Sequence, residues 1–209
     1  MGKLLYIQAS PRAERSKSIA VAEAFIDRYQ QAHRGDLIET LNVFDADLFA
    51  FDGLVVQAKY TILHGEKHTQ EELSAWKAVE KVIKQFTSAD KYVFAVPMWN
   101  FGIPYRLKQY IDILVQPGYT FSFSPEKGYQ GLVVGKPAFM AYARGGEYSD
   151  PAYAALNHQS TYLETILGFI GFSKISSVVV EPTLMAGPEK AEEKLTETIK
   201  KAKQLAGNF

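Results

Sequence analysis

The chain of 209 residues contains no cysteine. Disulfide bonds, thiolate nucleophiles, iron–sulfur clusters and cysteine-ligated zinc are therefore excluded. Net charge is also missing, because 23 Lys and Arg residues balance 23 Asp and Glu residues. Without a basic excess the sequence offers no stripe for a phosphodiester backbone, so nucleic acid is not an expected partner. Any redox chemistry must come from a bound cofactor.

Long apolar runs are missing as well. No stretch approaches the roughly 20 residues that span a membrane, and the first apolar segment reaches Ser10-Pro11-Arg12 too soon for a secretory signal. We therefore expect a cytoplasmic protein with no membrane partner. His64 and His68 are separated by a glycine, a glutamate and a lysine and have no evident third ligand, so no metal site is expected.

What the sequence does contain is a regular alternation of short apolar runs with stretches of helical period. With 47% hydrophobic and 22% charged residues, the composition is that of a globular protein. Strands joined by crossover helices form a parallel sheet with helices on both faces. Five such units predict a single α/β domain over residues 1–209, a flavodoxin-like doubly wound five-stranded sheet. In this strand order ligands bind near the loops after the first and third strands.

The expected strands cover residues 4–9, 37–44, 91–96, 138–143 and 175–180, the second at an edge of the sheet. The expected helices cover residues 18–29, 70–86, 103–115, 153–169 and 188–205. Residues 45–68 have no clean period and predict loop with at most a short helix. Between Tyr119 and Val134, alternating aromatics and a Pro-Glu-Lys-Gly turn predict an inserted β-hairpin.

The segment after the first strand is rich in hydroxyl and basic side chains, with Ser10, Ser16, Lys17 and Ser18 leading into a helix. A helix N-terminus offers a phosphate free backbone N–H groups and the positive end of the helix dipole. The glycine motifs of triphosphate and dinucleotide sites are missing, so a monophosphate fits better. The alternative is that Ser16 or Ser18 only caps the helix.

The segment after the third strand combines bulky apolar side chains with one amide: Pro97, Met98, Trp99, Asn100 and Phe101. Such a segment can support a planar ring whose heteroatoms bond to backbone N–H groups and to the amide. The alternative is that the aromatic side chains pack into the core.

The loop after the fourth strand contains Ala143, Arg144, Gly145 and Gly146. Paired glycines expose backbone N–H groups that can reach around the far edge of a ring, although a plain flexible turn is the alternative. One loop suited to phosphate and two suited to a flat ring indicate a single ligand, and flavin mononucleotide (FMN) is such a ligand.

These segments also carry a family resemblance. They resemble, together with Tyr119-Thr120-Phe121 and Leu167–Gly171, the FMN-dependent NADH-azoreductases, flavodoxin-like enzymes that reduce quinones and azo compounds. The resemblance extends from about residue 3 to residue 190. It implies that Ser10 and Ser16–Ser18 hold the FMN phosphate, that Met98–Phe101 line the flavin, and that residues 143–146 close over the ring.

The resemblance further implies a homodimer and a ping-pong mechanism. NADH or NADPH reduces FMN by hydride transfer, the nicotinamide leaves, and a quinone or azo acceptor takes its place, so the flavin and no side chain carries the chemistry. Two positions depart from the family pattern. Ala143 stands where a hydroxyl residue is common, and Trp99 stands where tyrosine is frequent.

Phe121 and Phe169 are candidate substrate-binding residues, as a hydrophobic lid, with core or dimer packing as the alternative. Apolar surface on the hairpin and on residues 48–60 also favours a dimer. Three other functions stay open: a quinone reductase of the same fold that uses FAD, a flavodoxin-type electron carrier, and a flavin-free regulatory module. Such carriers are usually acidic, whereas this chain is neutral, and Arg12, Arg15 and Arg144 suit an anionic cofactor.

Overall fold

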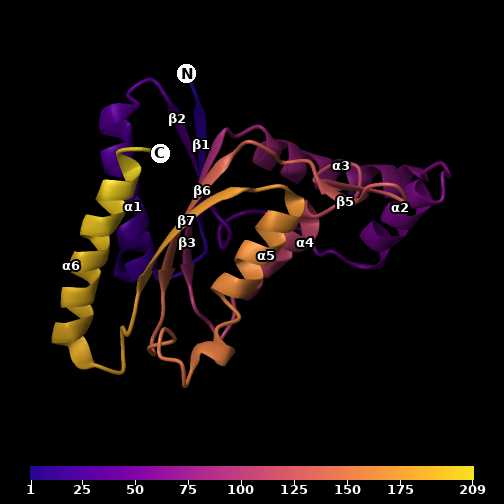
Figure 1. Ribbon diagram of the computed structural model, residues 1–209. Coiled ribbons are helices and arrows are strands. Elements are labelled where there is room, and N and C mark those ends of the chain that lie inside the picture. The colour runs from indigo at the N-terminus through magenta and orange to yellow at the C-terminus, as the bar shows by residue number, and fades with distance from the viewer.

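The computed structural model describes residues 1–209 and has one five-stranded parallel sheet covered by helices on both faces (Figure 1). The strands lie in the order β2-β1-β3-β6-β7. They are β1 (Lys3–Gln8), β2 (Leu37–Asn42), β3 (Lys91–Pro97), β6 (Pro137–Ala143) and β7 (Lys174–Val180). The predicted fold class is confirmed, and β2 lies at an edge as expected.

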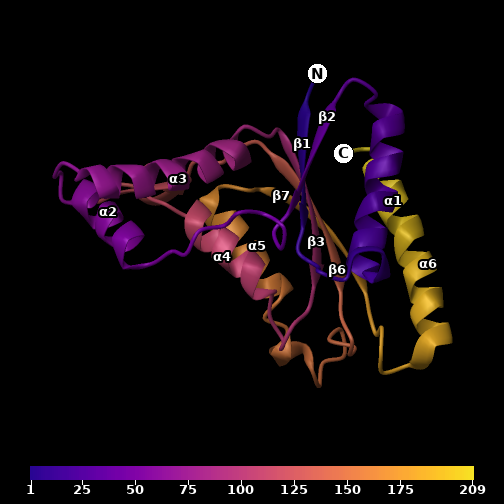
Figure 2. The ribbon, with the colours of Figure 1, turned by 180° about the vertical axis from the view of Figure 1, so that it is seen from behind.

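Helices on opposite faces of the sheet bury two separate apolar clusters (Figures 1 and 2). One face is covered by α1 (Lys17–Ala32) and α6 (Gly187–Ala206), and the other by α3 (Gln70–Thr87), α4 (Tyr105–Leu114) and α5 (Ser160–Ile170). On the first face the Phe25 ring stacks on Phe139 with 3.9 Å between centroids. Because both faces are covered, the central strands read as continuous apolar runs.

The inserted hairpin consists of β4 (Phe121–Ser124) and β5 (Gly128–Gly131), which pair antiparallel outside the main sheet. It packs on the end of α5, where a Cβ on Gly131 would overlap the backbone of Gly171. The prediction of a hairpin between Tyr119 and Val134 is therefore confirmed, with strands shorter than that range.

Two helices differ from the sequence predictions. Residues 45–68, expected as loop with at most a short helix, contain the 11-residue helix α2 (Gly53–Leu63). Its N-cap is Asp52, whose carboxylate accepts from the N–H groups of Leu54 and Val55. Its apolar residues show no period because they occur on most sides of the helix. The helix expected from residue 153 begins only at Ser160, because residues Ala154–Leu156 form a separate 3₁₀ turn before it. None of the helices is both long and apolar enough to cross a bilayer.

A capping box forms the start of α3, which follows α2 along the chain. Thr69 Oγ1 accepts from the Glu72 N–H at 3.2 Å, and Glu72 Oε2 accepts from the Thr69 N–H at 2.8 Å. Glu72 Oε1 also accepts from the Thr61 hydroxyl of α2 at 3.1 Å. The Thr69 N–H, and then the hydroxyl of Thr61, hold the pKa of Glu72 below its ordinary value.

We predict that Glu72→Gln is less stable than wild type at pH 7, and that the difference shrinks as the solution is acidified. A carboxyl whose pKa is lowered by folding stabilises the protein above its unfolded pKa of about 4.3, and this contribution is lost as the pH falls through the folded pKa. Urea denaturation at pH 7 and near pH 3 measures both differences. An equal difference at the two pH values would contradict the assignment.

Candidate functional site

The loops that follow β1, β3 and β6 lie next to one another at the carboxyl edge of the sheet, because these three strands are neighbours. The Ala9 N–H donates to the carbonyl of Ala95 at 2.9 Å, and the Met98 N–H donates to that of Ala143 at 2.8 Å. The winding of the chain reverses between β1 and β3, which is where doubly wound sheets bind ligands. The fold thus brings together all three segments singled out in the sequence.

The first loop presents a set of hydroxyls and free N–H groups at the start of α1. Ser10, Ser16 and Ser18 are buried, and the Oγ atoms of Ser16 and Ser18 lie 3.1 Å apart. Ser16 is the N-cap residue of α1, where its Oγ accepts from the Ile19 N–H at 3.5 Å. The backbone N–H groups of Lys17 and Ser18 have no acceptor within the chain. They and the helix dipole point to a place for an anion.

Lys17 and the arginines of this loop extend toward the surface. Lys17 Nζ lies 3.5 Å from a carboxylate oxygen of Glu192 in α6, an exposed residue. Exposed ion pairs of this kind stabilise a protein little, so the lysine is available to a phosphate. Arg12 and Arg15 are exposed.

The segment after β3 forms a tight hairpin turn. Trp99 and Gly102 exchange two backbone hydrogen bonds of 3.0 and 2.9 Å. Asn100 and Phe101, the two central residues, have positive φ angles of 46° and 69°, which suits asparagine better than phenylalanine. Residues with such strained backbone angles are common at active sites and ligand-binding sites. The N–H groups of Asn100 and Phe101 have no acceptor in the chain and are available to a ligand.

The loop after β6 is packed from one side and open on the other. The Gly145 carbonyl accepts from the N–H groups of Leu184 and Met185 at 3.0 and 3.1 Å, whereas the N–H groups of Gly145 and Gly146 have no acceptor. A Cβ on Gly145 would lie 3.0 Å from the Leu184 side chain, so the glycine permits this close approach. Ala143 has no hydroxyl, but its carbonyl still accepts from the Met98 N–H.

The Arg144 side chain is buried and bonded within the chain. Its guanidinium is 4% exposed and donates to Glu181 at 3.2 Å, Gln159 at 2.8 Å and Ser160 at 3.0 Å. The charge is therefore paired inside the protein. Its sequence neighbours gave no sign of this, because the acidic partner is 37 residues away.

Phe121 and Phe169 lie together but apart from the three loops. Their ring centroids are 4.9 Å from each other. Phe169 is next to the last residue of α5, and α5 returns from the carboxyl edge of the sheet toward the opposite edge (Figure 1). Within one chain the two rings therefore do not reach the site built by the loops.

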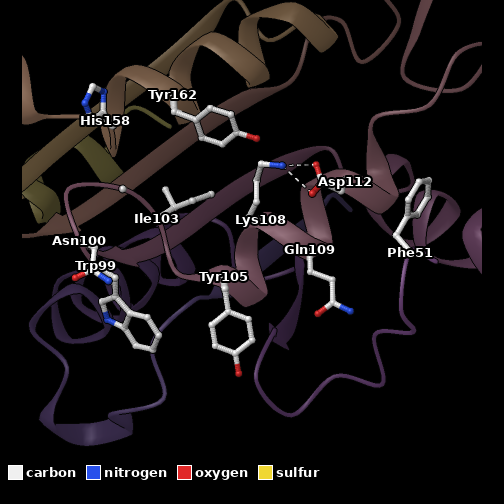
Figure 3. A pocket seen from close by; sticks show the side chains of 11 residues that line it. Phe51, Trp99, Asn100, Ile103, Tyr105, Lys108, Gln109, Asp112, His158 and Tyr162 are labelled. Atoms are coloured by element: carbon white, nitrogen blue, oxygen red, sulfur yellow. Dashed lines mark hydrogen bonds and ion pairs between the residues drawn. The ribbon is translucent and has the colours of Figure 1, made fainter. Parts of the chain in front are cut away.

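A cleft of about 780 Å³ adjoins the turn at Trp99 and Asn100 and lies between α4 and α5 (Figure 3). Its aromatic walls are Phe51, Trp99, Tyr105 and Tyr162. A Lys108–Asp112 ion pair of 2.6 Å lies on α4. Burial raises the pKa of Tyr162 to about 12, so its hydroxyl stays protonated at neutral pH. The sequence did not single out the α4 and α5 residues of this cleft, although Lys108 and Asp112 have the i,i+4 spacing of a helix pair.

The sheet order, the reversal of winding and the loops with unpaired N–H groups define a flavodoxin-like α/β protein. A family model described as flavodoxin-like fold matches residues 2–206. A relative in Nitratidesulfovibrio vulgaris named FMN-dependent NADH:quinone oxidoreductase is 50% identical, with 100% of both chains covered. One in Bacillus cereus with the same activity in its name is 39% identical over 100% of both chains.

Solved structures are also similar to this chain over nearly its whole length. The crystal structure of azoreductase from Bacillus anthracis has a TM-score of 0.91 at 34% identity, covering 100% of both chains. An FMN-dependent NADH-azoreductase of Bacillus anthracis in complex with FMN has a TM-score of 0.86 at 29% identity, covering 99% of this chain and 100% of that one. The chain belongs to the flavodoxin-like family of FMN-dependent NADH:quinone oxidoreductases and azoreductases, as the sequence resemblance implies.

We predict that Asn100→Ala is less stable than Asn100→Gly by about 1 kcal/mol, because a Cβ without a polar group disfavours the left-handed backbone of this turn. Urea denaturation of the two variants without ligand measures the difference. Equal stability would show that the turn does not hold this conformation in solution.

Proposed function

We propose that this protein is an FMN-dependent enzyme that oxidises NADH and reduces quinones and aromatic azo compounds. The observation that carries the proposal is the convergence of unpaired N–H donors from three neighbouring loops on one edge of the sheet. The names of the relatives, and the FMN complex of one similar structure, support the choice of FMN and NADH.

The first loop would bind the phosphate. The N–H groups of Lys17 and Ser18, the hydroxyls of Ser10, Ser16 and Ser18, and the Lys17 ammonium are all suitable donors. Hydrogen bonds to a charged phosphate are about twice as strong as neutral ones. The donor set fits one phosphate group, which favours FMN over the diphosphate of FAD.

The other two loops would hold the ring system. The backbone N–H groups of Asn100 and Phe101 lie in one loop and those of Gly145 and Gly146 in the other, and all four suit the carbonyl and nitrogen acceptors at the edges of a flavin. Pro97, Met98 and Trp99 supply the apolar surface beside them. Bound FMN would supply the two-electron chemistry, accepting a hydride from NADH and passing the electrons to the acceptor. Preorganised donors stabilise negative charge that develops on the ring.

We also propose a homodimer in which Phe121 and Phe169 cover the flavin site of the partner subunit. The two rings are half-buried and lie away from their own chain's loops. Exposed apolar side chains continue this surface along the hairpin and α2: Leu54, Tyr60, Ile62, Leu63, Phe123, Tyr129 and Leu132. A patch of this kind is typical of an interface. With NADH as the reductant, we place the enzyme in the cytoplasm.

The function is tested with protein saturated with FMN. We expect the visible flavin absorbance to bleach when NADH is added without oxygen, and to return when a benzoquinone is added. Chromatography of the flavin released from purified protein distinguishes FMN from FAD. A flavin that NADH does not bleach would contradict the enzyme.

Substitutions at Ser16 are the matched control for the site. Asp and Asn both cap helices well, but only Asp places a negative charge at the phosphate. We expect Ser16→Asp to weaken FMN binding by roughly a hundredfold and Ser16→Asn to weaken it much less. Riboflavin, which has no phosphate, should bind both variants like the wild type. An equal loss of riboflavin affinity would contradict the phosphate assignment.

The dimer is tested by complementation. In a heterodimer of a Ser16→Asp chain with a Phe169→Ala chain, one site combines intact loops with intact aromatic residues only if Phe169 acts in the partner subunit. We expect each homodimer to be nearly inactive and the doubly tagged heterodimer to recover about half of the wild-type turnover. A heterodimer as inactive as its parents, or a monomer in sedimentation, would refute this arrangement.

A further inference from the structure

A single buried amide connects the two loops assigned to the ring. Gln159, which is 0% exposed, precedes α5. Its Nε2 donates to the carbonyl of Val96 at 2.9 Å, near the end of β3, and its Oε1 accepts from Arg144 Nε at 2.8 Å, directly after β6. One side chain thus bridges the bases of both loops.

The arginine bonds complete a clamp around the second loop. Besides Gln159, the guanidinium of Arg144 binds Glu181 in an ion pair of 3.2 Å and the hydroxyl of Ser160 at 3.0 Å. The same Glu181 oxygen accepts from the N–H of Tyr148 at 3.0 Å. The loop of residues 144–148 is therefore fixed at both ends by charge-assisted bonds that are shielded from water.

The segment before α5 also contacts the tip of the first loop. The N–H of His158 donates to the carbonyl of Phe101 at 2.9 Å. This contact holds the strained turn from its carbonyl side and leaves the Asn100 and Phe101 N–H groups free. Residues 158–160 hence touch both loops, although neither loop is their neighbour in the sequence.

We propose that Gln159 is a positioning residue that sets the spacing between the Trp99–Gly102 turn and the Gly145–Gly146 loop. The inference rests on the proposed function, because the two loops are taken to grip opposite edges of a flavin ring. Donors on two loops bind a rigid ring well only when their separation is fixed before binding. Removing the amide would take the Gln159 donor from the Val96 carbonyl and leave the buried Nε–H of Arg144 without its acceptor.

Hydrogen exchange of the flavin-free protein tests the link directly. Gln159→Leu removes both bonds, so we expect faster exchange in residues 98–102 and in residues 144–148 together. Gln159→Glu keeps the acceptor for Arg144 and loses the donor to Val96, so only residues 98–102 should exchange faster. Thr165→Ala is the control on the same helix, because its exposed hydroxyl bonds only to the carbonyl of Thr161.

Binding titrations test the consequence for the ring. We expect Gln159→Leu to weaken FMN and riboflavin by the same factor, about tenfold or more, because the defect lies at the ring and not at the phosphate. This pattern differs from that of Ser16→Asp, which spares riboflavin. If Gln159→Leu does not fold, Gln159→Glu carries the test, with both flavins again weakened equally.

Three results would overturn the proposal: unchanged exchange in both loops, a uniform increase of exchange along the whole chain, or unchanged affinity for both flavins. Exchange is measured without flavin, so it reports on the link even if the wild type binds no FMN. Absence of flavin binding by the wild type would instead refute the proposed function.

Discussion

The parallel pairing of β1 with β3 and of β3 with β6 is the constraint on which the site depends. In this register Gln8 lies beside Ala95, and Pro97 beside Ala143, so the three strands end at one edge of the sheet. The loop before α1, the Trp99–Gly102 turn and the Gly145–Gly146 loop then become neighbours. Hydrogen bonds that build the sheet therefore also bring the three loops to one edge, and buried side chains beneath them link two of these loops.

Backbone N–H groups make up most of the proposed donor set, so the proposed site depends little on the two side chains that depart from the family pattern. Ala143 takes part through its carbonyl, so a missing hydroxyl changes little. Trp99 packs against Phe44, with 5.7 Å between ring centroids, and its own N–H is used inside the turn. Buried side chains act one layer below, where Arg144 and its partners hold the loops.

All five strands were predicted to within two residues. The central strands β1, β3 and β6 gave the clearest signal, because they are buried on both faces and therefore read as unbroken apolar runs. The helices were predicted less accurately than the strands. The apolar residues of α2 have no period, and only the N-cap signal of Asp52 marked its start. At α5 the predicted helix includes residues that form a separate 3₁₀ turn, Ala154–Leu156, before the helix begins at Ser160.

The sequence by itself determined the order of five strand–helix units, and that order places the loops after β1, β3 and β6 at a common edge. It also determined the residue types in them: hydroxyls at a helix start, a residue tolerant of positive φ, and paired glycines. Only the tertiary structure decided which charges are free. Arg144 is neutralised by a carboxylate 37 residues away, and Phe121 meets Phe169 far from their own loops. Such contacts join distant parts of the chain, so their partners exist only once the sheet and helices have packed.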